Sequence, residues 1–147
     1  MKILVCTDGS EHSQKAVEVA SKIAEGCNPD EVAIIYVHTP MDAAFMGGGA
    51  STDSMEVMRK LKEQQVEEGK KILERASAFF EEKNIKSSIM QEEGHPAATI
   101  VRVAAENNLD MIVIGSRGRG GWKKRILGSV SSAVVQEAKN CSVVTVK

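Results

Sequence analysis

The stretch from Leu109 to Ser131, LDMIVIGSRGRGGWKKRILGSVS, restricts how this chain can fold more than any other part of it. It opens with Met111 to Ile114, an uninterrupted apolar run, which is typical of a central parallel strand covered on both faces. A loop rich in glycine and positive charge follows, and Gly128 with Ser129 then begins a helical pattern. Because a helix N-terminus presents unpaired amides and partial positive charge, this order of elements predicts a phosphate-binding turn.

The loop carries three kinds of group that suit an anion. Glycines without side chains allow successive backbone amides to face one anion: Gly115, Gly118, Gly120 and Gly121. Basic side chains supply the counter-charge: Arg117, Arg119, Lys123, Lys124 and Arg125. Hydroxyls at the helix start add donors: Ser129, Ser131 and Ser132. A solvated surface loop is the usual place for such a basic run, but its alternation with glycines favours phosphate binding.

Two commoner glycine motifs do not fit this sequence. A Walker A loop needs Gly-x-x-x-x-Gly-Lys-Ser/Thr, but the Gly69-Lys70 pair has Gln64 at the first glycine position and Lys71 at the hydroxyl position. A dinucleotide fingerprint needs Gly-x-Gly-x-x-Gly after the first strand. The Gly118-Arg119-Gly120 segment instead runs on to a lysine and lies near the carboxyl end of the chain.

Elsewhere, short apolar runs alternate with helical spacing. Strands are expected at Lys2–Thr7, Val32–Val37, Ile85–Glu92, Met111–Ile114 and Val143–Val146. Helices are expected from Ser13 onward, over Met55–Lys83, from Pro96 and from Gly128. This alternation predicts a doubly wound α/β fold, a parallel sheet with helices on both faces. A length of 147 residues predicts a single domain, 1–147.

The carboxyl ends of the predicted strands bring remote segments together. In open α/β sheets, ligands bind beyond these ends, and Asp8, Val37 and Gly115 each lie at one of them. Taken alone, Asp8 is expected to cap the first helix and Val37 to belong to the sheet core. Their convergence with the glycine loop favours a ligand site instead. The long Thr39–Ser54 connection is expected to be functional or disordered, and a flap is one interpretation.

Composition narrows the classes of function. A net charge of −1 and 3% aromatic residues argue against nucleic acid as the partner. Three cysteines without Cys-x-x-Cys spacing indicate neither a disulfide framework nor a zinc site, which favours a reducing cytoplasm. No apolar run has the length of a signal peptide core or a membrane span, so no membrane partner is expected.

Catalytic motifs are missing around the three histidines, His12, His38 and His95. There is no His-Glu-x-x-His metal motif and no Gly-x-Ser-x-Gly nucleophile turn. Nucleotide hydrolases also need a positioned water and a group that activates it, and no general base stands out. Binding is therefore favoured over catalysis, and no catalytic residue is assigned.

The spacing Gly115-x-x-Gly118, nine residues, Gly128-Ser129 resembles the nucleotide-binding signature of the universal stress protein family. The resemblance covers the whole chain, because ILVCTDGSEHS, EVAIIYVH, GHPAATIV and SVVTVK all look like family segments. One departure is Ser142, which stands where the family usually has proline at the start of the last strand.

This resemblance implies a Rossmann-like five-stranded sheet of order 3-2-1-4-5 and a regulatory module of the stress response that binds ATP, or AMP or ADP. Magnesium or manganese bridging the phosphates is compatible with it. The residues that match the family's site are Asp8, Val37, Ile114, Gly115, Arg117, Gly118, Gly128, Ser129, Val130 and Ser131. Whether Asp8 contacts ribose or a metal stays open. Two alternatives also stay open: a slow ATPase or phosphotransferase in the same pocket, and a basic loop that binds nucleic-acid phosphates.

The C-terminal strand, Ser142 to Lys147, is the sheet edge in the order that the resemblance implies. An edge strand exposes unpaired amides and carbonyls and can pair with another chain. Val143, Val144 and Val146 are apolar and β-branched, and Lys147 is the strand's single charge. The sequence therefore predicts a homodimer in which two such strands pair across a two-fold axis.

Overall fold

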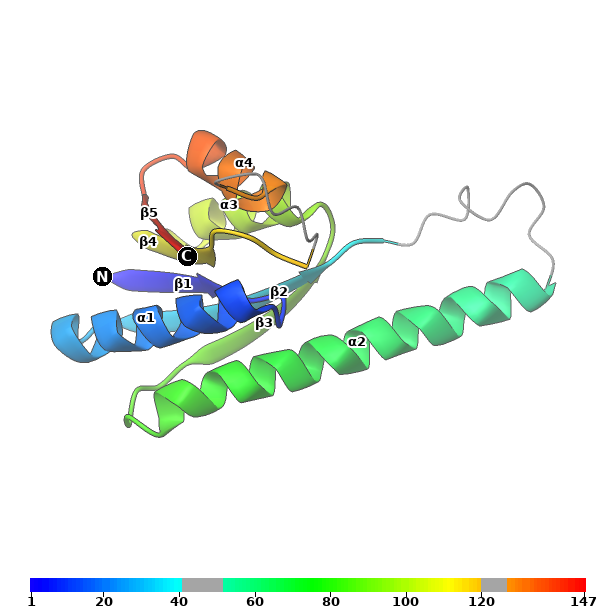
Figure 1. The fold of residues 1–147 in the computed structure, drawn as a ribbon, viewed down its shortest axis with the longest axis horizontal. Helices are drawn as coiled ribbons and strands as arrows, with labels where there is room; N and C mark the ends of the chain where they lie inside the picture. The colour runs from blue at the N-terminus through cyan, green and yellow to red at the C-terminus, as the bar shows by residue number, and fades with distance from the viewer. Residues whose placement is uncertain (41–51, 120–126) are drawn as a thin grey trace.

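Five parallel strands form one sheet in the order β3-β2-β1-β4-β5, as Figure 1 shows for the computed structural model, which describes residues 1–40, 52–119 and 127–147. The strands are β1 Lys2–Cys6, β2 Glu31–His38, β3 Ser88–Glu93, β4 Met111–Gly115 and β5 Ser142–Val146. The helices are α1 Glu11–Cys27, α2 Thr52–Glu81, α3 Pro96–Glu106 and α4 Ser129–Glu137. The predicted doubly wound fold and its strand order are confirmed.

The sheet separates two hydrophobic clusters. On one face, side chains such as Ile3, Val5 and Val113 pack against α1 and α2 (Figure 1). On the other face, Leu4 and Ile112 pack against α3 and α4. The apolar runs of β1 and β4 are continuous because these central strands are covered on both sides. No helix in the described ranges has both the length and the apolar character to cross a membrane.

Two predicted element starts are wrong by three residues, and the other boundaries differ by at most two. The third strand begins at Ser88 instead of Ile85, because residues 82–84 form the turn that ends α2 and residues 85–87 connect it to the strand. In this turn Asn84 has a left-handed φ of 57°, and the amide of Ile85 donates to the carbonyl of Phe80 at 2.9 Å. The second helix begins at Thr52, inside the connection expected over 39–54, of which 41–51 lies outside the described residues.

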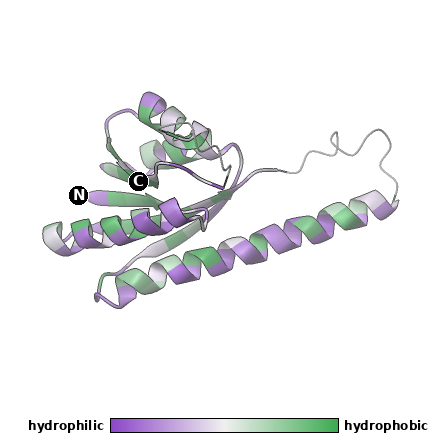
Figure 2. Ribbon diagram, viewed as in Figure 1, coloured by the Kyte–Doolittle hydropathy of each residue, from purple (hydrophilic) through white to green (hydrophobic). Residues whose placement is uncertain are grey.

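The first half of α2 extends past the end of the sheet (Figure 1). Its large apolar side chains are not buried in the core, since Met55, Val57 and Val66 are 62%, 47% and 41% exposed. Hydrophobic and hydrophilic residues alternate along this part of the helix (Figure 2). The buried face of α2 starts only at Gly69.

Gly69 marks the closest approach of α2 to the sheet. A Cβ atom at this position would lie 2.5 Å from a ring carbon of Tyr36 on β2 and 2.6 Å from the side-chain amide of Gln91 on β3. That amide also donates to the carbonyl of Val66 at 3.1 Å. Glycine lowers the helix propensity at this position, but the absence of a side chain leaves room for the Tyr36 ring.

Replacement of Gly69 by alanine is therefore expected to destabilise the protein. Helix propensity alone favours alanine by up to about 1 kcal/mol, whereas overpacking costs about 1–3 kcal/mol, so steric conflict decides the sign. The matched control is Gly26→Ala near the end of α1, where a Cβ would meet nothing within 4 Å. Urea unfolding should give Gly69→Ala a lower free energy of unfolding than wild type, with Gly26→Ala equal or higher. A Gly69→Ala protein as stable as Gly26→Ala would contradict this packing argument.

Candidate functional site

The turn from β1 into α1 positions the first charged group of the site. Ser10 is the N-cap of α1, since its hydroxyl accepts from the amide of Ser13 at 3.3 Å. Asp8 therefore does not cap this helix. Its Oδ1 instead accepts from the amide of Ser10 at 2.9 Å, and Gly9 turns the chain with a φ of 79°. These bonds fix the Asp8 carboxylate above the carboxyl end of the sheet.

The carbonyl of Ser116 joins the end of β4 to the start of α4. It accepts from the amide of Gly128 at 2.7 Å and from the hydroxyl of Ser131 at 2.9 Å. The Ser131 hydroxyl also lies 3.1 Å from the carbonyl of Gly128. Both carbonyls that its proton can reach lie where the end of β4 meets the start of α4. The two ends of the glycine loop are held together in this way, although seven residues between them, 120–126, lie outside the described structure.

The N-terminus of α4 presents unpaired amides at the same end of the sheet as Asp8. The amide of Ser132 donates to the carbonyl of Gly128 at 2.9 Å and is the first that helical geometry pairs. The amides of Ser129, Val130 and Ser131 precede it and have no partner within the helix. Gly128 is the N-cap and offers no side chain to cover them. Together with the helix dipole, these amides give a site for negative charge.

At two glycines of the loop, a side chain would collide with neighbouring atoms. A Cβ on Gly115 would lie 2.7 Å from the carbonyl carbon of His12, and one on Gly118 would lie 2.6 Å from Oδ2 of Asp8. Among the described glycines, only Gly9 and Gly94 have positive φ, so Gly115 and Gly118 do not need left-handed backbone. The amide of Arg119 donates to the same Oδ2 at 3.2 Å. The loop and the β1–α1 turn are thus in direct contact.

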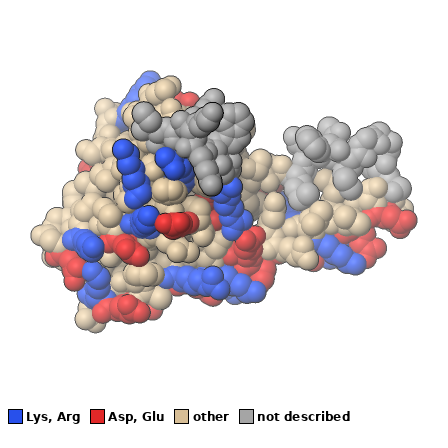
Figure 3. Space-filling model, in the orientation of Figure 1, with Lys and Arg blue, Asp and Glu red and all other residues tan. Residues whose placement is uncertain are grey.

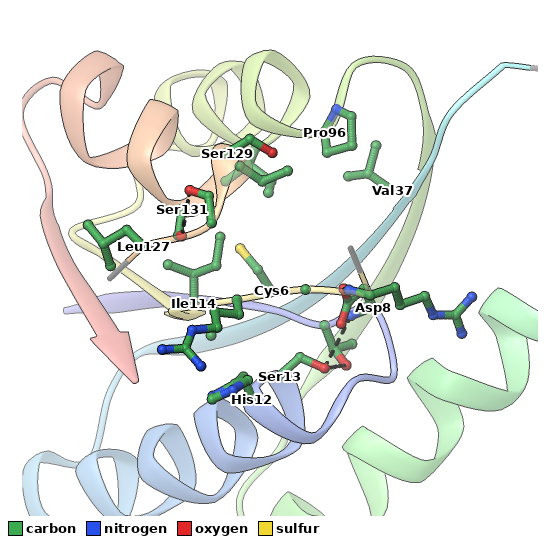
Figure 4. A pocket seen from close by; sticks show the side chains of 18 of the residues that line it. Cys6, Asp8, His12, Ser13, Val37, Pro96, Ile114, Leu127, Ser129 and Ser131 are labelled. Carbon is green, nitrogen blue, oxygen red and sulfur yellow. Dashed lines mark hydrogen bonds between the residues drawn. The ribbon is translucent and has the colours of Figure 1, made fainter. Parts of the chain in front are cut away.

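These segments surround a cavity of about 640 Å³. All ten residues that the sequence singles out line it: Asp8, Val37, Ile114, Gly115, Arg117, Gly118, Gly128, Ser129, Val130 and Ser131. In Figure 4, Val37, Pro96 and Ser129 lie on one side of the open space, and Cys6, Ile114 and Asp8 lie on the other. The cavity opens where β1, β2 and β4 end, as expected for this class of sheet.

The cavity has an apolar part and a polar part. Val37, Ile35, Ile100 and Ile114 line the apolar part, together with Cys6, whose pKa is raised by burial so that the thiol stays protonated. The polar part contains Asp8, Arg117, Arg119 and the start of α4. In the face shown in Figure 3, basic and acidic side chains alternate along α2 without a continuous basic surface in the described part. An apolar recess beside a helix start that favours negative charge suits a ligand with a flat ring system and a phosphate.

Residues 1–147 match the sequence model of the Universal stress protein family. The chain belongs to this family. Universal stress protein MJ0531 of Methanocaldococcus jannaschii is 35% identical to it over 146 residues, which are 99% of this chain and 81% of that protein. The solved structure of hypothetical protein MJ0577 of the same organism superposes with a TM-score of 0.82 at 27% identity and covers 99% of this chain and 94% of the other. A universal stress protein crystallised with cAMP gives a TM-score of 0.72 at 25% identity, with 100% and 97% covered.

Sequence analysis missed part of the cavity wall of this universal stress protein. Cys6, Ile35, Pro96 and Ile100 all line it; they lie in segments that resemble the family, but they are not among the predicted site residues. Strand alternation could have found Ile35, because it lies two residues before Val37 and so shares its face. The residues on α3 could not have been found this way, since their contribution depends on how α3 crosses the sheet.

Proposed function

We propose that this universal stress protein binds an adenine nucleotide, ATP or its relatives ADP and AMP, as a regulatory ligand in the stress response. The observation that carries the proposal is the uncapped start of α4 facing the same cavity as the apolar wall. An apolar recess favours the base, and unpaired amides at a helix start favour phosphate. The related universal stress protein crystallised with cAMP supports an adenine ligand.

In this proposal each part of the nucleotide meets a matching part of the cavity. The base lies against Val37 and Ile114, and the ribose lies toward Asp8. The phosphates face Gly118 and the amides of 129–131, with Arg117 as counter-charge. A charge-assisted bond from amide to phosphate is about twice as strong as a neutral one. In this arrangement the ring system of the nucleotide is buried, and its phosphates are paired with amides and a guanidinium.

Magnesium or manganese fits this site as an ion that the phosphates also hold. Among the described residues that line the cavity, Asp8 is the one carboxylate, and its two oxygens accept from the amides of Ser10 and Arg119. The described residues contain no group of three His, Cys, Asp or Glu side chains that could hold a metal. Mg²⁺ is usually held by one or two carboxylates together with phosphates and water, so Asp8 would supply the protein's carboxylate in the alternative in which it contacts the metal and not the ribose.

A homodimer through β5 forms the second part of the proposal. β5 is an edge of the sheet, and it pairs with β4 on one side. The amide of Ser142 donates to Asp110, and the carbonyl of Val146 accepts from Ser116. Since backbone groups of successive residues point to opposite sides, Val143 and Thr145 direct theirs outward, where a second β5 can pair.

A cytoplasmic location, suggested by three free cysteines, also stays a prediction.

Replacement of Gly118 by valine is expected to weaken ATP binding by about tenfold or more, which is about 1.4 kcal/mol. The new side chain would displace the Asp8 carboxylate and fill the space next to it. Gly26→Val is the matched control, since a Cβ there has open space. Isothermal titration calorimetry on both variants, after urea unfolding shows that they are folded, checks the prediction. Unchanged ATP affinity in folded Gly118→Val would remove Gly118 from the site.

Replacement of Thr145 by proline is expected to convert the dimer to a folded monomer at micromolar concentration. Proline removes an outward donor and leaves the β4 ladder intact. Val144 is unsuitable for this test, because its amide points toward β4 and its loss would damage the sheet itself. Thr145→Ala, which keeps the amide, is the control and should remain dimeric. Light scattering that finds a monomeric wild type, or a Thr145→Pro dimer, would exclude this interface.

A further inference from the structure

Arg119 is held at the edge of the cavity by two contacts that lead in different directions. Its backbone amide donates to Oδ2 of Asp8 at 3.2 Å, which ties the loop to the β1–α1 turn. Its guanidinium Nη2 donates to Oε1 of Glu68 on α2 at 2.7 Å. Arg119 also lines the cavity. Its guanidinium is nevertheless paired with Glu68, a residue of α2 that is not part of the cavity lining.

The position of Glu68 is fixed by its neighbours on α2. Gly69 packs against Tyr36, and the carbonyl of Val66 accepts from Gln91. Ile72, one turn later, lies against Gly9, since a Cβ on that glycine would be 2.9 Å from Ile72 Cδ1. α2 is therefore anchored on both sides of Glu68, next to the turn that carries Asp8. The backbone of Glu68 is thereby held beside the turn that carries Asp8, within reach of Arg119.

The ion pair itself is weak enough to exchange. The Arg119 and Glu68 side chains are 52% and 51% exposed, and exposed pairs of this kind change an equilibrium constant by a factor of about 1.5 to 5. A polyphosphate carries more negative charge than one carboxylate and accepts several hydrogen bonds from a guanidinium. A phosphate chain that reached Arg119 would therefore compete successfully with Glu68.

We propose that Arg119 selects nucleotides by the length of their phosphate chain and that Glu68 sets how strongly it does so. The inference rests on the proposed nucleotide function. A first phosphate is satisfied by the amides at the start of α4. Additional phosphates bring charge to the loop and draw the guanidinium of Arg119 away from Glu68. Glu68 is then a positioning residue, and nucleotides with a longer chain break a contact between the site and α2.

The test compares adenosine, AMP and ATP on wild type, Glu68→Gln, Arg119→Gln and the double variant by calorimetry at fixed, low ionic strength. Glu68→Gln should tighten ATP binding by about two- to fivefold and leave adenosine unchanged, because the guanidinium no longer has to leave a carboxylate. Arg119→Gln should weaken ATP more than AMP. In the Arg119→Gln background, Glu68→Gln should have no further effect, which a general change of charge would not produce.

Glu67→Gln is the matched control. Glu67 is the preceding residue of α2, is 61% exposed and lies 4.0 Å from Lys71 of the same helix. The variant removes the same charge from the same helix and should leave every affinity unchanged.

Three results would overturn the inference while nucleotide binding stands. They are equal effects of Glu67→Gln and Glu68→Gln on ATP, equal effects of Glu68→Gln on adenosine and ATP, and a Glu68→Gln effect that persists without Arg119. If no adenine compound binds wild type, the proposed function fails, and the inference fails with it.

Discussion

The backbone carbonyl of Ser116 is the junction on which the site depends. It receives the amide of Gly128 and the hydroxyl of Ser131, so the start of α4 is fixed to the end of the central strand β4. Together with the packing of α4 on the sheet, this junction sets the position of the α4 start relative to the β1–α1 turn. The close contact of Gly115 with His12 fixes the second relation, between β4 and α1. Strand ends, helix start and acidic turn then meet around one cavity.

Much of this arrangement could be predicted from the sequence. Apolar runs and helical spacing determine element types, and the fixed spacing of Gly115, Gly118 and Gly128 identifies the family, from which the strand order follows. All ten residues of the predicted site do line one cavity. Local pattern suffices here because parallel strands must end at the same edge, so residues that follow strands converge without knowledge of any distance.

The rest depends on tertiary packing, which local pattern does not contain. Gly69 appears in the sequence as a weak point of a helix, and only its distance to Tyr36 shows why a side chain is excluded. Met55 fits an amphipathic helix, yet the sheet ends before it. Ile85 looks like the start of a strand but closes the turn after α2. Glu68 carries no motif, and only the fold brings it to Arg119.

α2 links these observations, because it supports the site from outside. Its segment around Gly69 packs on the sheet, Ile72 supports the turn after β1, and Glu68 reaches the glycine loop. The half of α2 before this segment extends beyond the sheet. The glycine loop is therefore in direct contact with α2, the longest helix of the described structure. A nucleotide bound as proposed would have a route through this contact by which its presence alters the surface of the protein.

The most direct test of the central claim is an amide NMR titration of the wild-type protein with ATP. The account predicts that the largest shifts fall on the amides of Gly118 and of residues 128–131, with smaller shifts near Val37. The exposed start of α2, residues 52–61, should shift little. The account would be contradicted if ATP caused no shifts at millimolar concentration. It would also be contradicted if the perturbed amides lay away from the glycine loop and the start of α4.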